Sequence, residues 1–205
     1  MHAALLYFDE EAHPARRLAA ALAIEAQRVG RHRFPDDELC LRLPVEELPT
    51  CLVIYRSLNH PNDKLVELML LARHARERGV EHLVLVAPYL AYMRQDMAFN
   101  PGELVSQRLV GGFLAESFDA VVTVDPHLHR IERLDQAVPL RHAIALSGAP
   151  QLAVTIAERR HEALLLGPDA ESAQWVESAA RVAGLDSGVC TKVRHGDRDV
   201  DIALP

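Results

Sequence analysis

The chain contains few aromatic residues, few cysteines, few glycines and no long apolar segment. Of its 205 residues, 5% are aromatic, three are cysteine and 10 are glycine. Cys40, Cys51 and Cys190 are odd in number and widely spaced, which excludes a disulfide framework and a zinc motif and predicts reduced thiols in the cytoplasm. No apolar run reaches the roughly 18–20 residues that a membrane span requires, so we expect no membrane partner.

The rest of the composition is that of an ordinary globular protein. Hydrophobic residues make up 49% and charged residues 25% of the chain, which excludes a disordered or collagen-like protein. The formal net charge is -7 at pH 7. Because phosphate backbones repel a net anion, we expect no nucleic-acid partner. Asp9, Glu10 and Glu11 stand where a signal peptide would carry positive charge.

Short apolar segments alternate with longer amphipathic segments along most of the chain. The segments predicted to be strands are residues 52–55, 83–87, 120–124, 163–166, 189–193 and 200–204. The segments predicted to be helices are residues 61–78, 103–117, 149–160 and 171–183. This alternation predicts an α/β fold with a parallel sheet, in which residues 83–87 are covered on both faces. Residues 133–147 have mixed polarity, and we place a domain junction there, between residues 1–145 and 146–205.

Ligands bind beyond the carboxyl ends of parallel strands, so residues that follow each predicted strand are candidate site residues. A long loop with Arg94 and Gln95 follows residues 83–87. The Arg94 guanidinium can donate paired hydrogen bonds to phosphate oxygens, and Gln95 can recognise a base or ribose edge. The structural alternative is a contact between Arg94 and Asp96 with buried tyrosines nearby.

A second candidate is residues 34–38, which we call the acidic turn. Phe34 can stack on a base, and the carboxylates of Asp36, Asp37 and Glu38 can accept hydrogen bonds from an exocyclic amine or from ribose hydroxyls. Motifs this short are weak indicators of function, and the alternative is a charged surface turn.

Possible metal ligands follow two other predicted strands. Asp125, His127 and His129 alternate after residues 120–124, and on an extended segment the two imidazoles point the same way. A metal-dependent hydrolase could use such a set. Asp169 follows residues 163–166, where its carboxylate can meet a ligand at the sheet edge or cap the next helix.

Lys192 and Arg194 form the last candidate group. Lys192 lies near the end of the predicted strand at residues 189–193, and Arg194 follows it directly, so on an extended segment the two side chains share one face. Two cations beside a mobile turn can stabilise phosphate charge, although a solvated surface is the ordinary location of such residues. The chain has no Walker or Rossmann glycine motif, so a bound nucleotide would be held by side chains and helix N-termini.

Five motifs, taken together and in this order, resemble the ribose-phosphate pyrophosphokinases, the synthetases of phosphoribosyl pyrophosphate (PRPP). They are Arg-Phe-Pro-Asp-Asp-Glu at 33–38, His-Pro-Asn-Asp at 60–63, Pro-Tyr-Leu-Ala-Tyr-Met-Arg-Gln-Asp at 88–96, Val-Asp-Pro-His at 124–127 and Gly-Pro-Asp at 167–169. The resemblance implies parallel-sheet phosphoribosyltransferase-like domains, the second one incomplete. It also implies transfer of a pyrophosphoryl group from ATP to ribose 5-phosphate, which yields PRPP and AMP.

The resemblance also implies roles for the candidate residues near the nucleotide. The acidic turn, with Phe34, Asp36, Asp37 and Glu38, corresponds to a loop that receives adenine. In the family this loop reaches a neighbouring subunit's site, which implies a homo-oligomer. Arg94 and Gln95 correspond to an ATP-binding pair.

The remaining candidates correspond to residues that act on the phosphates. His127 and Asp169 match ligands of magnesium (Mg²⁺), which as a hard cation also takes phosphate and water oxygens. Lys192 and Arg194 match catalytic cations of a flexible loop, which would neutralise charge on the transferred group.

The chain departs from the family pattern in three respects. One is that residues 128–133 replace the Phe-Phe-rich stretch that usually follows the Asp-x-His motif. The family's ribose 5-phosphate loop comes after the position of Pro205 and is not found in this sequence, so we expect little turnover from this chain alone. Residues 43–50 lack the Ser-Val-Arg-Gly stretch of phosphate-activated members. The alternative functions are a non-catalytic partner that regulates a true synthetase and the metal-dependent hydrolase described above.

Overall fold

The computed structural model describes residues 2–44, 47–160, 162–194 and 200–205. The chain divides into two compact units, Met1–Leu146 and Ser147–Pro205. We describe each unit by itself. No helix in the described part of the chain is long and apolar enough to cross a membrane.

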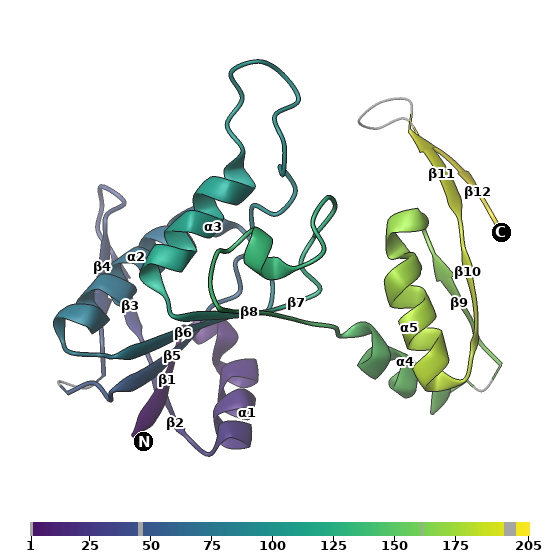
Figure 1. Ribbon diagram of the computed structural model, residues 1–205. Helices are drawn as coiled ribbons and strands as arrows, with labels where there is room; N and C mark the ends of the chain where they lie inside the picture. Colours follow the sequence, from purple (N-terminus) through teal and green to yellow (C-terminus); the bar gives the residue numbers. More distant parts are fainter. Residues whose placement is uncertain (1, 45–46, 161, 195–199) are drawn as a thin grey trace. The chain divides into compact units, whose positions relative to one another are not determined.

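The first unit is built on a six-stranded sheet in which all neighbouring strands are parallel (Figure 1). In spatial order its strands are β2 (Glu25–Arg28), β1 (Ala3–Tyr7), β5 (Cys51–Tyr55), β6 (His82–Ala87), β7 (Ala120–Val124) and β8 (His142–Leu146). Helices cover both faces, as expected of a parallel sheet. The expected α/β fold with a parallel sheet is confirmed.

Within the part of this unit that the structure describes, three helices and two short 3-10 turns complete the architecture. Helix α1 (Ala12–Leu22) lies on one face of the sheet, and α2 (Pro61–Glu77) and α3 (Ser106–Ser117) lie on the other (Figure 1). The 3-10 turns are η1 (Asp9–Glu11) and η2 (Leu134–Gln136). Gly79, with φ of 83°, follows α2 in the left-handed conformation that favours glycine.

The two faces of the sheet are covered unequally, which corrects the expectation for residues 83–87. Leu83, Leu85 and Ala87 are fully buried under α2 and α3, whereas Val84 and Val86 on the opposite face are only half-buried. The reason is that α1 packs against β1 and β2 at one side of the sheet. An apolar groove of about 640 Å³ therefore remains beside α1 along the faces of β5, β6 and β7.

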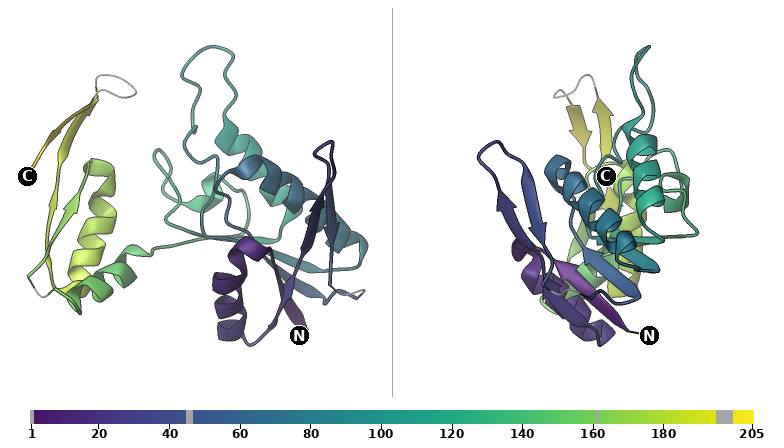
Figure 2. Two further views of the ribbon diagram at one scale, coloured as in Figure 1. Left: turned by 180° about the vertical axis from the view of Figure 1, so that it is seen from behind. Right: turned by 90° about the vertical axis from the view of Figure 1, so that its left-hand side faces the viewer.

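A hairpin stands apart from the main sheet. Strands β3 (Gly30–Arg33) and β4 (Leu39–Arg42) pair with each other in antiparallel register and with no other strand in the described residues. The hairpin projects from the unit, with the acidic turn at its tip (Figure 2). Leu41 and Leu43 pack against the main hydrophobic core and anchor its base.

The described residues of the second unit form two short sheets and two helices. Strands β9 (Leu164–Gly167) and β10 (Asp186–Val189) are parallel, and β11 (Thr191–Arg194) and β12 (Val200–Ala203) are antiparallel. Helix α5 (Ala173–Ala183) packs against α4 (Ala149–Ala157) and against the first sheet. The 3-10 turn η3 (Ala170–Ser172) joins β9 to α5.

Candidate functional site

A cavity lies where β6 and β7 end, at the carboxyl edge of the main sheet. Its volume is about 490 Å³. Its walls are the loop after β6, the first residue of α3 and the loop after β7. The lining residues are Tyr89, Leu90, Tyr92, Met93, Arg94, Gln95, Ser106, Val124, Asp125, Pro126 and His127. The structure thus brings together Arg94, Gln95 and His127 from two separate sequence motifs.

Arg94 is exposed at this cavity. The structural alternative proposed from the sequence, an ion pair between Arg94 and Asp96, does not form, because the Asp96 carboxylate is bound to Arg130 instead. The nearby tyrosines are not fully buried either, since Tyr89 is 51% exposed and Tyr92 is half-buried. Arg94 is therefore placed where its guanidinium can meet an anionic ligand.

Gln95 fastens the cavity loop to helix α3. Its side-chain oxygen accepts hydrogen bonds from the backbone nitrogen of Ser106 at 3.2 Å and from the Ser106 hydroxyl at 2.6 Å. These contacts satisfy a free N–H group at the start of α3, as a capping side chain does. They explain why α3 begins at Ser106 rather than at residue 103. Glu103 instead accepts hydrogen bonds from Phe99 and Asn100.

Asp96 joins the two loops that form the cavity and was not among the predicted site residues. Its side chain is 1% exposed, and Arg130 Nη1 lies 2.6 Å from one carboxylate oxygen. His129 Nδ1 lies 3.9 Å from the other oxygen. Because Asp96 directly follows Gln95 and Arg130 follows the Asp125–His129 segment, this ion pair fixes the two walls relative to each other.

Strained backbone is concentrated at this edge of the sheet. Tyr92 and Asp125, which both line the cavity, have φ angles of 62° and 41°. The left-handed region is costly for residues other than glycine, and such strain is often found at functional sites. Hydrogen bonds hold both residues: the Tyr92 hydroxyl donates to Asn62, and the Asp125 backbone nitrogen donates to Leu146 at the end of β8.

The predicted histidine pair has the expected common orientation. The rings of His127 and His129 are nearly parallel, with centroids 6.2 Å apart. Only His127 lines the cavity, whereas His129 lies beside Asp96. No three His, Cys, Asp or Glu side chains in the described ranges are arranged to hold a metal ion, so the geometry gives no support to a hydrolase built on Asp125, His127 and His129.

The acidic turn does not contribute to this cavity. Phe34 is 45% exposed at the hairpin tip, and Asp36, Asp37 and Glu38 are exposed beside it. Backbone hydrogen bonds between Phe34 and Glu38 and from Asp37 to Phe34 close the turn. The side chains therefore project from the hairpin and remain accessible to a ligand that binds outside this cavity.

Two of the predicted residues of the second unit lie in contact. Asp169 caps η3, since its carboxylate accepts a hydrogen bond from the Ser172 backbone nitrogen at 3.2 Å. The second carboxylate oxygen lies 3.3 Å from Lys192 Nζ. Arg194 ends β11, and its side chain lies outside the described residues.

His127 lies in the first unit and Asp169 in the second, and each offers one donor group to a metal ion, an imidazole and a carboxylate. A carboxylate oxygen is the kind of ligand that Mg²⁺ prefers, whereas an imidazole alone does not single out Mg²⁺. Asp169 already has a cation, Lys192, beside it.

Comparison with known proteins identifies relatives across almost the whole chain. Residues 4–117 match a family profile, the N-terminal domain of ribose phosphate pyrophosphokinase. The chain is 35% identical to the ribose-phosphate pyrophosphokinase of Methanopyrus kandleri over 91% of its own length and 64% of that relative's length. It is 34% identical to the Halobacterium salinarum enzyme of the same name, over 90% of this chain and 66% of that relative.

A structural comparison agrees at the level of the fold. The phosphoribosylpyrophosphate synthetase from Mycobacterium smegmatis has a TM-score of 0.80 with this chain at 18% identity, covering 99% of this chain and 67% of that structure. The chain thus spans about two thirds of the length of its relatives. More than half of its residues match one family profile, and we conclude that the chain belongs to the ribose-phosphate pyrophosphokinase family.

Proposed function

We propose that the chain acts in the transfer of a pyrophosphoryl group from ATP to the 1-hydroxyl of ribose 5-phosphate, with PRPP and AMP as products. The observation that carries this proposal is the cavity in which Arg94, Gln95 and His127 meet at the carboxyl edge of the sheet. This chemistry needs positioned charges rather than a protein nucleophile.

Each proposed residue has a distinct task. Arg94 donates paired hydrogen bonds to phosphate oxygens, while Gln95 holds the cavity loop on α3 and contacts the nucleotide. His127 and Asp169 are the proposed ligands of Mg²⁺. When bound, this ion would neutralise charge on the phosphates and orient them. Lys192 and Arg194 are the proposed catalytic cations, which stabilise the negative charge of the transferred group.

The quaternary structure and location follow from the same proposal. We place a phosphoribosyltransferase-like domain at residues 1–145 and a partial one at residues 146–205. The exposed acidic turn, with Phe34, receives the adenine of ATP bound to a neighbouring subunit, which requires a homo-oligomer. ATP and ribose 5-phosphate are soluble cytoplasmic metabolites, so we propose a cytoplasmic enzyme.

A fusion protein tests the proposed activity. The chain matches only 64% of the length of the M. kandleri relative. We propose that the unmatched part of that relative binds the phosphate of ribose 5-phosphate. The chain alone should bind Mg·ATP but form AMP slowly. A fusion of the unmatched part to Pro205 should form AMP and PRPP from ATP and ribose 5-phosphate. A folded fusion that binds both substrates without forming either product would refute the activity.

The same fusion tests the role of Lys192. Lys192→Ala should lower the rate of AMP formation by roughly 10²–10³, the scale observed when one charge-stabilising donor is lost, while leaving the thermal unfolding temperature nearly unchanged. Lys64→Ala serves as a control, because Lys64 is a cation outside the cavity lining whose side chain bonds the Ser57 carbonyl and Asn59. Equal losses of rate and stability in Lys192→Ala would show that Lys192 is structural.

A further inference from the structure

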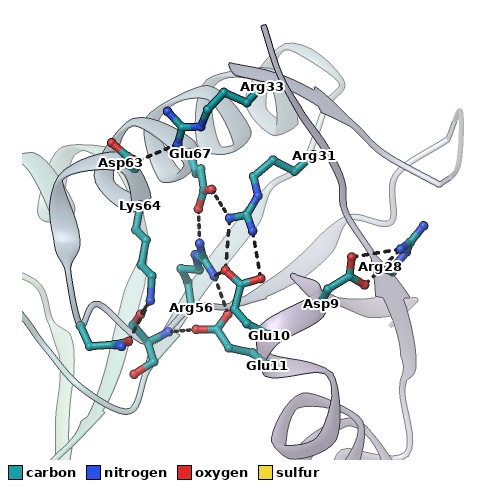
Figure 3. A network of polar contacts seen from close by, with 12 residues as sticks. Asp9, Glu10, Glu11, Arg28, Arg31, Arg33, Arg56, Asp63, Lys64 and Glu67 are labelled. Atoms are coloured by element: carbon teal, nitrogen blue, oxygen red, sulfur yellow. Dashed lines mark hydrogen bonds and ion pairs between the residues drawn. The ribbon is translucent and has the colours of Figure 1, made fainter. Parts of the chain in front are cut away.

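Two ion pairs join strand β3 of the hairpin to helix α2. Arg31 Nη1 lies 2.8 Å from Glu67, and Arg33 Nη2 lies 2.6 Å from Asp63 (Figure 3). We call these two ion pairs the strand–helix ladder. Alternate strand residues are about 6.6–6.8 Å apart along a strand, and residues four apart on a helix rise by about 6 Å. The two spacings match, so the arginine side chains of β3 reach both carboxylates of α2, while the strand of the hairpin that packs against the helix is β4.

The ion pair between Arg31 and Glu67, which we call the inner ion pair, is supported by a buried arginine that also bonds Glu67. The side chains of Arg56 and Glu67 are each 1% exposed, and they bond to each other at 2.5 Å (Figure 3). Arg56 also contacts Glu10 and Glu11 of η1, and its guanidinium lies 4.2 Å from the ring centre of Phe8. Movement of the Glu67 side chain would therefore leave the buried guanidinium of Arg56 without this partner, which is energetically costly.

The hairpin has few other restraints on its direction. It has no third strand among the described residues, and its apolar anchors all lie at its base: Val29 directly before β3, and Leu41 and Leu43 on or beside β4. Strand β3 is instead held by Arg31, which also bonds Glu10 at 3.1 Å. Apolar contacts hold the base of a hairpin against the core, but they restrict its angle to the core only weakly, because hydrophobic contact is non-directional. A backbone hydrogen bond from Val29 to Tyr7 fixes the base of β3, and the directional contacts further along the strand are those of the ladder.

We propose that Arg31, acting through Glu67, is a positioning residue that holds the acidic turn in one orientation so that it can receive an adenine base. The inference rests on the proposed function of the acidic turn. A turn with a fixed orientation loses less conformational entropy when it binds. If loss of the inner ion pair leaves the binding-competent orientation populated about one tenth of the time, the apparent Kd for an adenine nucleotide rises about tenfold.

The second end of the ladder connects the hairpin to the cavity. Asp63, which pairs with Arg33, is preceded by Asn62, whose side chain accepts a hydrogen bond from the Tyr92 hydroxyl at 2.5 Å. Tyr92 lines the cavity. The first turn of α2 thus contacts the hairpin on one side and the cavity loop on the other, so the two nucleotide-binding elements share one support.

The orientation can be measured without any ligand. Spin labels on the exposed Cys40 of β4 and on an Arg73→Cys variant of α2, with Cys51 and Cys190 replaced by alanine, report the distance between hairpin and helix. We expect a single narrow distance in the parent chain and a broad distribution in Arg31→Gln. The control is Arg28→Gln, which removes an exposed ion pair with Asp9 and should leave the distribution narrow.

Folding of these variants is safeguarded by the remaining contacts. In Arg31→Gln, Glu67 and Glu10 keep their bonds to Arg56. Arg31→Lys retains the charge but loses the two-pronged geometry of the guanidinium, so it should give an intermediate distribution. A narrow distribution in Arg31→Gln that equals the parent's would overturn the proposal.

The second measurement compares Mg·ATP with Mg·tripolyphosphate, which has no base. Arg31→Gln should raise the Kd for Mg·ATP about tenfold and leave the Kd for Mg·tripolyphosphate unchanged, and Arg28→Gln should change neither. Equal weakening of both ligands would contradict base positioning. If the parent chain binds neither ligand, the proposed function fails, and the distance measurement alone decides whether Arg31 orients the hairpin.

Discussion

The carboxylate of Glu10 lies between two guanidinium groups, those of Arg56 and Arg31, at 2.8 and 3.1 Å. Burial by itself raises the pKa of this carboxyl, but the hydrogen bonds from Arg56 and Arg31 outweigh burial and lower its pKa to about 2. Glu11 shows the opposite balance: burial raises its pKa despite the contact with Arg56. One short 3-10 turn therefore carries two carboxyl groups with opposite pKa shifts.

The low pKa of Glu10 predicts a loss of stability in acid. Its carboxylate stabilises the fold above pH 4.5, and this contribution is lost as the pH falls from 4.5 toward 2. The Glu10 side chain is 39% exposed, so solvent screening reduces the effect, and we expect about 1–2 kcal/mol. Glu11 has the opposite sign and offsets part of it.

Urea unfolding across this pH range measures the contribution. All four tyrosines lie in Met1–Leu146 and the one tryptophan lies in the second unit, so tyrosine fluorescence in a Trp175→Phe background reports on the first unit. Glu10→Gln should flatten the pH dependence of the unfolding free energy. If the Glu10→Gln variant keeps the slope of the parent chain, the two arginines do not stabilise the carboxylate.

Arg56 provides a second prediction at the residue scale. Arg56→Leu leaves the buried Glu67 and the nearly buried Glu11 with less compensation, and we expect a loss of about 3–5 kcal/mol in the unfolding free energy. Arg28→Leu, which removes an exposed pair with Asp9, should cost less than about 1 kcal/mol. Tyrosine-detected urea unfolding measures the unfolding free energy of both variants. Similar losses in the two variants would contradict the claim that burial makes the Arg56 ion pairs more costly to break.

Among the elements, helix α3 offers a matched pair of glycines. A Cβ atom at Gly111 would lie 1.8 Å from the Ala137 carbonyl oxygen, whereas a Cβ atom at Gly112 would meet nothing within 4 Å. Gly111→Ala should therefore destabilise the first unit by about 2–3 kcal/mol through overpacking. Gly112→Ala should stabilise it by about 0.5–1 kcal/mol, because alanine favours the helix.

The same tyrosine-detected unfolding experiment reads both glycine variants. Opposite signs for neighbouring positions would show that α3 rests directly on the backbone near Ala137. If Gly111→Ala proves neutral, the close approach of α3 to this segment is wrong.

At the element scale, the sequence was informative where burial follows a simple period. The run at residues 83–87 predicted β6, and the apolar spacing after Pro61 predicted α2. Strand β8 could not be predicted, because four of its five residues, including Leu146 and Ile144, are exposed rather than buried as in a central strand. Its place at the sheet edge depends on pairing with β7, a long-range contact that local polarity does not encode.

The candidate site was predictable to a similar degree. Arg94 and His127 were recognisable because both follow strands whose carboxyl ends share one sheet edge. The ion pair of Asp96 with Arg130, 34 residues apart in sequence, could not be predicted, since charged residues at that separation show no periodic relation. The strand–helix ladder could not be predicted for the same reason. In the sequence its arginines are indistinguishable from ordinary surface charges, and only the fold brings them beside the carboxylates of α2.

For the whole molecule, the family relation and the geometry of the first unit together define the central claim. The chain belongs to the ribose-phosphate pyrophosphokinases, and its cavity of about 490 Å³ presents Arg94 to an incoming ligand. We propose that this ligand is the phosphate chain of ATP. Arg94 takes no part in the ion pair between Asp96 and Arg130 that joins the two cavity walls. Replacing Arg94 should therefore leave the cavity walls in place.

Calorimetric titration of Mg·ATP into the chain and its Arg94→Ala variant tests this claim most directly. We expect saturable binding to the parent chain and a Kd raised by about tenfold or more in Arg94→Ala, because a charge-assisted hydrogen bond to phosphate contributes about 1.5–3 kcal/mol. Arg133→Ala, on an exposed segment outside the cavity lining, serves as the matched control and should bind as the parent does. Equal affinity of the Arg94→Ala and parent chains, or no binding by the parent, would contradict the account.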